Sequence, residues 1–535
     1  MDFSKPLQEN TPQNLPWLRR EKRDLGKILI VYPVTGMDVA GINVGLPLSA
    51  LYLSAVLKPA GYRVELIDER LTTNFAEDVR RSIEREKPVL VGVSSMTGLQ
   101  IRGGLKAARA VRDVDPRVPL VWGGVHPTLC PDSTLKDELC DYVVLGEGEI
   151  TLIELADALR RQGGPDAGDL AAIRGLGYKE DGKLRFTPGR PLIEELDVIP
   201  PPDYDLIDME HYFTTAPSTG QRQLQIVTSR GCPYDCEFCY NLKFNERRFR
   251  YFSAERVVSD IEYVVNRYGV KAIFVEDDYF FGHPGRVEAI CDELIERDLG
   301  LLIQVPCRID YLHKRSPAMI DKLYKAGFKE LWVGIESGSE GRLKEIMKRN
   351  TLDQVREVNQ LLSGSDVYVK YGFMAGFPNE DRRETLETVD FMFELMSANS
   401  NAGVAPVAIY TPYPGTTLYD KAKLVYGMKM PETLEEWSHF HFAKNNNPFL
   451  SEDQKHFVTK VNVMSKFFER KAFERFCNNR FKPVMMGIYA LYYKILRLRL
   501  KYRFFAFMPE IRLIQWMEKL YLQAFHRTQL ANKRT

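Results

Sequence analysis

Short apolar runs alternate with helical patterns along the first third of the chain. The first run, KILIVYP at 27–33, is bounded by polar residues and is the length of a strand buried on both faces. The runs that follow are YRVELID around Val64, PVLVGVSS from Pro88, PLVWGG from Pro119 and DYVVLGEGE from Asp141. Helical patterns such as GLPLSALYLSAVLKPAG separate them. Five strands alternating with helices predict an α/β fold, a doubly wound, flavodoxin-like parallel sheet over residues 27–160.

Small and polar residues follow three of these predicted strands, in SSMTG (94–98), GGVHPT (123–128) and GEGE (146–149). Doubly wound sheets bind ligands at the carboxyl ends of their strands, where small residues let a ligand approach the backbone. Ordinary strand-to-helix turns are the alternative. No GxGxxG fingerprint and no GxxxxGK[ST] phosphate loop occurs in this region, which weakens the usual nucleotide interpretations.

A second strand-helix series runs over residues 221–420, after a linker at 161–220. The linker contains a predicted hairpin, GLGYKEDGKLRFT, that turns at Asp181 and Gly182. The strand candidates of the second series are QLQIVTS (223–229), AIFVEDD (272–278), LLIQVPC (301–307), ELWVGIES (330–337), VYVKYGFMAG (367–376) and GVAPVAIYTP (403–412). Six such strands predict a partial (β/α)6 barrel of the TIM type, whose chemistry lies at the carboxyl ends of its strands. Those ends are polar, which favours a site.

The two ends of the chain differ from these series. Residues 1–26 form an amino-terminal extension without an apolar stretch of signal-peptide length, so we expect a cytoplasmic protein. Residues 421–535 read as a helical, basic and aromatic region, with 12 Lys and Arg against 2 Glu from Arg480 onward. Its longest uncharged run, 483–493, is too short to span a bilayer. A helix at a membrane surface and a domain packed on the barrel remain two interpretations.

Charge and cysteine usage narrow the function. With 73 basic and 72 acidic residues, the chain as a whole gives no reason to expect nucleic acid as a partner. Three of its eight cysteines, Cys232, Cys236 and Cys239, are spaced CxxxCxxC after the first barrel strand. A structural zinc normally has four protein ligands, whereas three thiolates on a [4Fe-4S] cluster leave one iron open. The scattered cysteines Cys130, Cys140, Cys291, Cys307 and Cys477 are assigned no role.

The cysteine motif resembles the signature of the radical S-adenosylmethionine (SAM) superfamily, CxxxCxΦC, in which the aromatic position is Phe238 here. The resemblance implies that the open iron binds SAM and that reduction cleaves SAM to a 5'-deoxyadenosyl radical. It also implies SAM-binding roles in FVEDDYF, CRID, GIESGSE and GFMAGFPNE. The residues so implied are Phe238, Asp277, Asp278, Arg308, Glu336, Ser337 and Gly376. The family's common GGE is absent, so the choice among Glu276, Asp277 and Asp278 stays open.

Residues 27–420 as a whole are similar to the branch of this superfamily that carries a cobalamin-binding domain. The resemblance gives the first sheet a ligand, cobalamin, at its strand ends. The residues so implied are Ser94, Ser95, Gly123, Gly124, Val125, His126, Gly146 and Gly148. The DxHxxG motif that supplies a histidine ligand to cobalt occurs nowhere in the chain, so we expect cobalamin bound base-off and without histidine. His126 is expected to lie near the corrin edge or in solvent. A vestigial domain that has lost cobalamin is the alternative.

The expected function is that of a radical SAM enzyme acting on a small, hydrophobic organic substrate, with carbon methylation favoured. An oxidative cyclase resembling the anaerobic Mg-protoporphyrin IX monomethyl ester cyclases is the alternative reaction. A corrinoid carrier or an iron-sulfur sensor without catalysis is the alternative of another class. An electron donor such as flavodoxin or ferredoxin, and peripheral contact with a membrane, complete the expected partners.

Overall fold

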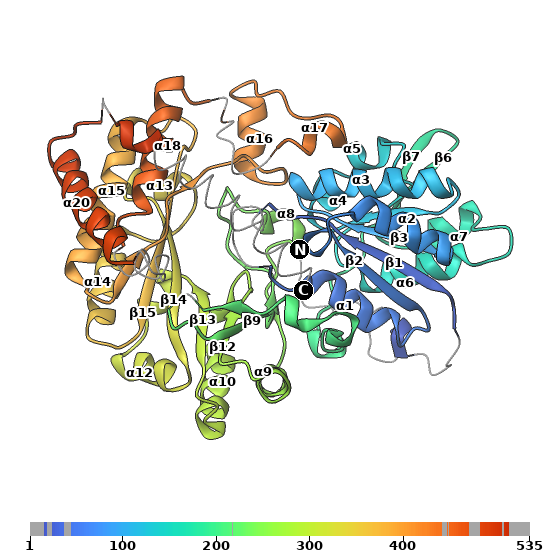
Figure 1. Cartoon of the computed structure of the whole chain (residues 1–535), viewed down its shortest axis with the longest axis horizontal. Coiled ribbons are helices and arrows are strands. Elements are labelled where there is room, and N and C mark those ends of the chain that lie inside the picture. Colours follow the sequence, from blue (N-terminus) through green and yellow to red (C-terminus); the bar gives the residue numbers. More distant parts are fainter. Residues whose placement is uncertain are drawn as a thin grey trace, which may run out of the picture.

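Two α/β units lie side by side in the computed structural model of the chain (Figure 1). The structure describes residues 15–18, 24–36, 44–216, 218–440, 447, 449–469, 482–505 and 508–512. The first unit carries the blue and teal elements of Figure 1, and the second unit carries the green and yellow ones. A single hydrophobic cluster extends from the first sheet into the second, so the two units are packed together rather than joined only by the chain.

The first unit contains a seven-stranded sheet in the order β2-β1-β3-β4-β5-β6-β7. Its parallel strands are β1 (Lys27–Tyr32), β2 (Arg63–Asp68), β3 (Leu90–Ser94), β4 (Leu120–Gly123) and β5 (Tyr142–Val144). The helices α1 (Leu48–Leu57) and α6 (Gly148–Leu159) pack on one face of the sheet, and α2 (Phe75–Arg85) and α3 (Leu99–Val114) pack on the other. Alternate residues of β1 therefore enter different cores. This arrangement confirms the predicted doubly wound sheet and its flavodoxin-like strand order.

The predicted hairpin is also present, with β6 (Leu176–Glu180) and β7 (Lys183–Phe186) paired antiparallel. Asp181 and Gly182 both have positive φ, 49° and 72°, which is the backbone that a two-residue hairpin turn requires. β6 pairs with β5, so the hairpin extends the first sheet instead of lying free in the linker.

The second unit is an open, curled sheet of parallel strands in sequential order. These are β9 (Arg222–Ile226), β12 (Ala272–Val275), β13 (Leu302–Cys307), β14 (Phe328–Glu336), β15 (Tyr368–Ala375) and β16 (Ala402–Val404). The short strand β8 (Thr214–Thr215) closes one edge antiparallel to β9. The helices between the strands are α9 (Ala254–Tyr268), α10 (Pro284–Arg297), α12 (Pro317–Lys325), α14 (Leu352–Ser363) and α15 (Arg382–Ala398). The partial (β/α)6 barrel is confirmed, although the sixth predicted strand is divided into β16 and β17 (Ala408–Ile409), which both pair with β15.

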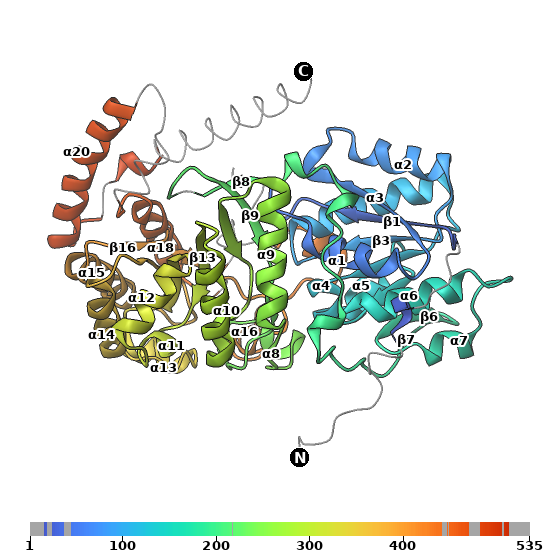
Figure 2. The ribbon, with the colours of Figure 1, turned by 90° about the horizontal axis from the view of Figure 1, so that it is seen from below.

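The carboxyl-terminal region touches both units. After α16 (Thr417–Leu424), the short helix α17 (Leu434–Trp437) returns to the first unit, where Leu434 and Trp437 enter the core beside α3 (Figure 1). The helices α18 (Glu452–Ser465) and α20 (Lys482–Lys501) lie on the barrel side, as the view from below also shows (Figure 2). The predicted helical segment is thus confirmed over 482–501, while residues 513–535 lie outside the described residues. None of the described helices is both long and apolar enough to cross a membrane.

Candidate functional site

The three cysteines of the CxxxCxxC motif lie on one loop whose base is closed by a strand pair. β10 (Ser229–Arg230) and β11 (Arg250–Tyr251) pair antiparallel at the two ends of this cluster loop, residues 231–249. Gly231 has a φ of 80°, and a Cβ there would collide with the carbonyl oxygen of Arg248. Only glycine fits at this position, so the residue before Cys232 is determined by the tight closure of the loop.

The cysteine side chains are largely shielded from water and have polar neighbours. Arg308 Nη1 donates to Cys236 Sγ at 3.5 Å, and Asn241 Nδ2 lies 3.8 Å from Cys239 Sγ. Burial raises the pKa of Cys232 to about 11 and that of Cys239 to about 12. Both thiols are therefore protonated at neutral pH until iron displaces the protons, as in other thiolate sites. No three His, Cys, Asp or Glu side chains in the described ranges are grouped so that they could hold a single metal ion.

The acidic residues after β12 hold the cluster loop in place. Asp277 is buried and accepts hydrogen bonds from Thr228 N at 2.6 Å, Thr228 Oγ1 at 2.5 Å and Ser229 Oγ at 2.7 Å. Asp278 accepts from Gly231 N at 3.1 Å and from the Tyr240 hydroxyl at 2.8 Å. Both oxygens of Asp277 are thus engaged within the chain, whereas Asp278 and the neighbouring Glu276 line a pocket. This favours Glu276 or Asp278 over Asp277 as a group that reaches a ligand.

Arg308 links the third barrel strand to the same loop. Its guanidinium lies over the Tyr234 ring at 3.6 Å and donates to Asp310 Oδ1 at 2.9 Å and to the Lys348 carbonyl at 2.7 Å. Together with the contact to Cys236, these bonds engage all three guanidinium nitrogens. The structure therefore places Arg308 beside the cysteines, where it joins the end of β13 to the cluster loop through Cys236 and Tyr234.

Two predicted SAM-binding residues lie at the end of β14. Glu336 has a φ of 77°, unusual for a side chain with a Cβ, and its carboxylate accepts from Lys348 Nζ at 2.7 Å. Such backbone strain at the end of a barrel strand is characteristic of functional sites. Ser337 is buried, and its hydroxyl accepts from Ser339 N at 3.1 Å and lies 3.4 Å from Thr388 Oγ1. Ser337 is therefore turned toward its own loop and toward α15 (Arg382–Ala398).

The loop after β15 is shaped by Glu380, which the sequence interpretation quoted within a motif but did not select. Glu380 Oε2 accepts from Gly376 N at 2.6 Å and from Phe377 N at 2.9 Å, and its other oxygen accepts from Thr385 Oγ1 at 2.6 Å. Gly376 has a φ of 89°, which the turn requires. Phe377 in turn packs edge-on against Phe238 of the cluster loop, with ring centroids 6.4 Å apart. The fifth-strand loop and the cluster loop are thereby brought together.

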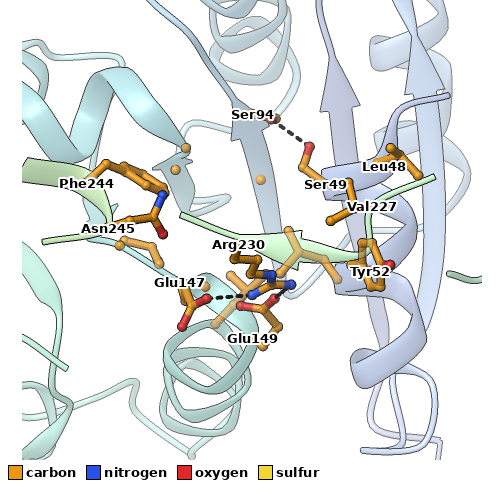
Figure 3. A pocket seen from close by; sticks show the side chains of 18 of the residues that line it. Leu48, Ser49, Tyr52, Ser94, Glu147, Glu149, Val227, Arg230, Phe244 and Asn245 are labelled. Atoms are coloured by element: carbon orange, nitrogen blue, oxygen red, sulfur yellow. Dashed lines mark hydrogen bonds and ion pairs between the residues drawn. The ribbon is translucent and has the colours of Figure 1, made fainter. Parts of the chain in front are cut away.

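A pocket of about 390 Å³ lies between the two units, at the carboxyl ends of the first sheet (Figure 3). Of the eight residues predicted for cobalamin, five line it, namely Ser94, Gly123, Gly124, Gly146 and Gly148. Ser95, Val125 and His126 are not among the lining residues. The first unit also contributes Ser49 and Tyr52, and the second contributes Val227, Arg230, Tyr240, Phe244 and Asn245. Among the described residues that line the pocket, none is a histidine.

Because Gly123 and Gly146 have no side chains, the pocket floor formed by the strand ends of the first sheet has room for a flat ligand. A Cβ at Gly146 would meet nothing within 4 Å, and one at Gly123 would find its nearest atom at 3.8 Å. Larger residues there would fill space that is now open toward the pocket. The mostly apolar lining and this open floor fit a planar macrocycle such as the corrin ring, held without a histidine ligand.

His126 lies beneath this floor and not in solvent, which corrects one of the two positions expected for it. Its ring is fully buried, its Nδ1 is 2.9 Å from Thr97 Oγ1, and its centroid is 5.2 Å from that of Trp437. Burial lowers the pKa of His126 to about 3. The ring is therefore neutral at physiological pH and belongs to the packing between α4 (Val125–Leu129) and α17.

The residues that sequence reasoning missed join the pocket to the cluster loop by buried ion pairs. Arg230, directly before the loop, contacts Glu147 and Glu149 at 2.7 Å each (Figure 3). Arg250 also contacts Glu147, at 2.8 Å. Ile193 N also donates to Glu147 at 2.7 Å. Burial alone would raise the pKa of Glu147, but the two arginines hold it below its usual value. The available signal was the pair of glutamates in GEGE and the arginine in SRGC.

Comparison with known proteins identifies both units. Residues 42–156 match the model of the B12 binding domain, and residues 226–392 match that of the radical SAM superfamily. The chain is 31% identical over 399 residues to an uncharacterized methyltransferase of Pyrococcus horikoshii, covering 74% of this chain and 83% of that protein. It is 30% identical over 402 residues to the anaerobic magnesium-protoporphyrin IX monomethyl ester cyclase of Rubrivivax gelatinosus, covering 74% and 70%. The chain therefore belongs to the family of radical SAM enzymes that carry a B12-binding domain.

A solved structure shows the same fold at low sequence identity. The cobalamin-dependent S-adenosylmethionine radical enzyme OxsB, with aqua-cobalamin and S-adenosylmethionine bound, superposes with a TM-score of 0.69 at 19% identity. The superposition covers 92% of this chain and 74% of OxsB. The arrangement of the two units is thus shared with a structurally known member of this class.

Proposed function

We propose that this chain is a cobalamin-dependent radical SAM methyltransferase that acts on a carbon atom of a small organic molecule. The observation that carries the proposal is the pocket bounded by the strand ends of the B12-binding unit on one side and by the cluster loop on the other. When bound, the cluster with SAM supplies a 5'-deoxyadenosyl radical, and cobalamin supplies a methyl group. Relatives described as methyltransferases support methyl transfer over other outcomes.

In this proposal Cys232, Cys236 and Cys239 hold the [4Fe-4S] cluster. The SAM-binding set is the one predicted from the sequence, with Asp277 acting through the loop it braces. Glu380 fixes the two amides that follow β15, and Arg308 donates to Cys236 Sγ and so braces the cluster loop. The cobalamin-binding set consists of the five predicted residues that line the pocket, with Ser95, Val125 and His126 supporting them from below.

The test is anaerobic reconstitution with iron and sulfide, followed by reduction in the presence of SAM. We expect one [4Fe-4S] cluster per chain and release of 5'-deoxyadenosine, and we expect the triple variant Cys232→Ala, Cys236→Ala, Cys239→Ala to lose both. Cys291→Ala is the matched control, because Cys291 is buried in α10 away from the loop and should leave the iron content unchanged. Stoichiometric zinc without iron would contradict the proposal.

The second candidate reaction is oxidative ring closure, which the similarity to the Rubrivivax gelatinosus cyclase favours. Product mass separates the two reactions, since methylation adds a methyl group and ring closure removes hydrogen. We also infer a one-electron donor such as flavodoxin or ferredoxin, a cytoplasmic location and peripheral contact with a membrane through the carboxyl-terminal segment. If SAM is cleaved with a chemical reductant but not with reduced flavodoxin or ferredoxin, that protein is not the electron donor.

A further inference from the structure

The helix α20 exposes an apolar stripe at the outer edge of the barrel unit. The stripe is formed by Ile488, Leu491, Ile495, Leu498 and Tyr502, which are 54%, 64%, 39%, 55% and 67% exposed. Their alternating spacing of three and four residues places them in one line along the helix and just past its end. Figure 2 shows α20 at the side of the molecule away from the B12-binding unit. Five large apolar side chains in one exposed line are unusual for a surface helix.

The stripe is not needed to attach α20 to the barrel, because another face of the helix does this. Tyr489, Tyr492, Leu496 and Leu500 are buried, and the Tyr492 ring packs edge-on against Phe467 with centroids 4.9 Å apart. These four residues are three or four positions apart, which places them together on a different side of the helix. α20 is therefore held in place while its second apolar face stays in solvent.

A row of cations lies beside the stripe. Lys494, Arg497 and Lys501 are exposed, and their spacing places them in a line parallel to the apolar one. No carboxylate contacts any of these three among the residues that the structure describes. Residues 482–505 contain six Lys and Arg and no Asp or Glu. The exposed side of the helix thus combines an apolar line with unneutralised positive charge.

We infer that α20 docks on the surface of a membrane that contains anionic lipid, with the stripe in the headgroup boundary and the cations at the phosphates. An apolar face flanked by Lys and Arg is the arrangement that lies in the plane of such an interface. A second copy of this chain is a poorer occupant, because a two-fold contact between the stripes would bring two identical cationic rows together. The helix lies on the membrane and does not cross it, since it is not apolar enough to span.

The experiment is flotation of the full-length protein with vesicles of phosphatidylcholine alone or of phosphatidylcholine with phosphatidylglycerol. We expect binding to the anionic vesicles at low salt and weakening as salt screens the charges. The variant Lys494→Gln, Arg497→Gln, Lys501→Gln should bind about a hundredfold more weakly, from about fivefold per charge. The variant Leu491→Ser, Leu498→Ser should also lose binding. The matched control is Leu424→Ser, Val425→Ser, since these residues are 81% and 70% exposed on α16 and just beyond it.

Equal binding to neutral vesicles, or no binding to anionic vesicles at low salt, would overturn the inference. So would a dimer in light scattering that the stripe variant converts to monomer, because the stripe would then be an interface between copies. Reductive SAM cleavage in solution is expected to be unchanged in the two α20 variants, because the substituted side chains are exposed on the side of the barrel unit away from the B12-binding unit. A failure of membrane binding is therefore distinguishable from a failure of the proposed function.

Discussion

Breaking the ion pairs between Arg230 and the two glutamates should uncouple the two units. Arg230 is two residues before Cys232, and Glu147 and Glu149 flank Gly148 at the pocket floor. Their side chains are 17%, 8% and 7% exposed, so the charges are held largely out of water. The perturbation is Arg230→Gln, Glu149→Gln and the combination of the two.

The magnitude follows from which charges lose their partners. In Arg230→Gln, Glu147 keeps Arg250 at 2.8 Å, but Glu149 is left without its arginine. Removing one member of a buried pair costs about 3–5 kcal/mol. Glu149→Gln keeps a hydrogen-bond acceptor and leaves Arg230 paired with Glu147, so we expect a smaller cost of about 1–3 kcal/mol. The double variant removes Arg230 together with the glutamate that would otherwise be left unpaired, so it should cost less than the sum of the single variants, by about 1–3 kcal/mol.

The assay is urea unfolding of the cluster-free, cobalamin-free protein, followed by circular dichroism and by tryptophan fluorescence, which together test whether the two units unfold in one transition. In the reconstituted enzyme, Arg230→Gln should still release 5'-deoxyadenosine but form less product per molecule released, because the cluster loop is no longer held to the pocket floor. Cobalamin affinity of the cluster-free variant is a second readout that does not depend on turnover. Additive single costs, with a coupling below about 0.5 kcal/mol, would refute the reasoning.

Three further predictions follow from the site. Because the arginines lower the pKa of Glu147 in the folded protein, its contribution to stability should be present above the usual glutamate value of about 4.3 and be lost as pH falls below it, which urea midpoints between pH 7 and pH 3 would measure. Glu380→Gln replaces one of the two carboxylate oxygens that organise the loop after β15 by an amide nitrogen, so the dissociation constant for SAM in anaerobic calorimetry should rise about tenfold, for a loss of about 1–2 kcal/mol. Bound cobalamin should be base-off, and electron paramagnetic resonance of the reduced cobalt should show no histidine nitrogen in either the parent protein or His126→Ala; nitrogen splitting in the parent that vanishes in the variant would contradict the position of His126.

Both sheets could be predicted from the sequence because their signals are local. Apolar runs such as 27–33 and 272–278 report burial on both faces, and the turn residues Asp181 and Gly182 report a hairpin. The cysteine spacing is also local, since three ligands on one short loop need no knowledge of the fold. The glycines at the ends of β4 and β5 could be predicted for the same reason, because small residues after a strand can be recognised without knowing which other strands lie beside it.

The contacts between the units could not be predicted, because they join residues far apart in the chain. Arg230 and Glu147 are 83 residues apart, and neither the arginine nor the glutamate is distinctive by itself. His126 was expected near the corrin edge or in solvent, but Trp437 returns from the carboxyl-terminal region and packs edge-on against its buried ring. Asp277 was selected by its position after β12, yet its oxygens are turned to Thr228 and Ser229, a choice that depends on side-chain packing.

The distance between the pocket floor and the cluster loop is set by buried charges with which the linker also bonds, because Ile193 N donates to Glu147 and Ile193 O accepts from Arg250. The linker enters the second sheet at β8, which pairs with the edge strand β9. Arg230 and Arg250 contact the loop after β5 directly, through ion pairs with Glu147. Separation of the two units would break the ion pairs of Glu147 and Glu149. It would leave Arg230 and Arg250, which belong to the strand pair of β10 and β11, without their carboxylate partners. The strand pair that closes the cluster loop is thus the same element that holds the B12-binding unit. Loading of the cluster and closure of the pocket should consequently depend on one another, and cobalamin should bind more tightly to the chain with its cluster than to the chain without it.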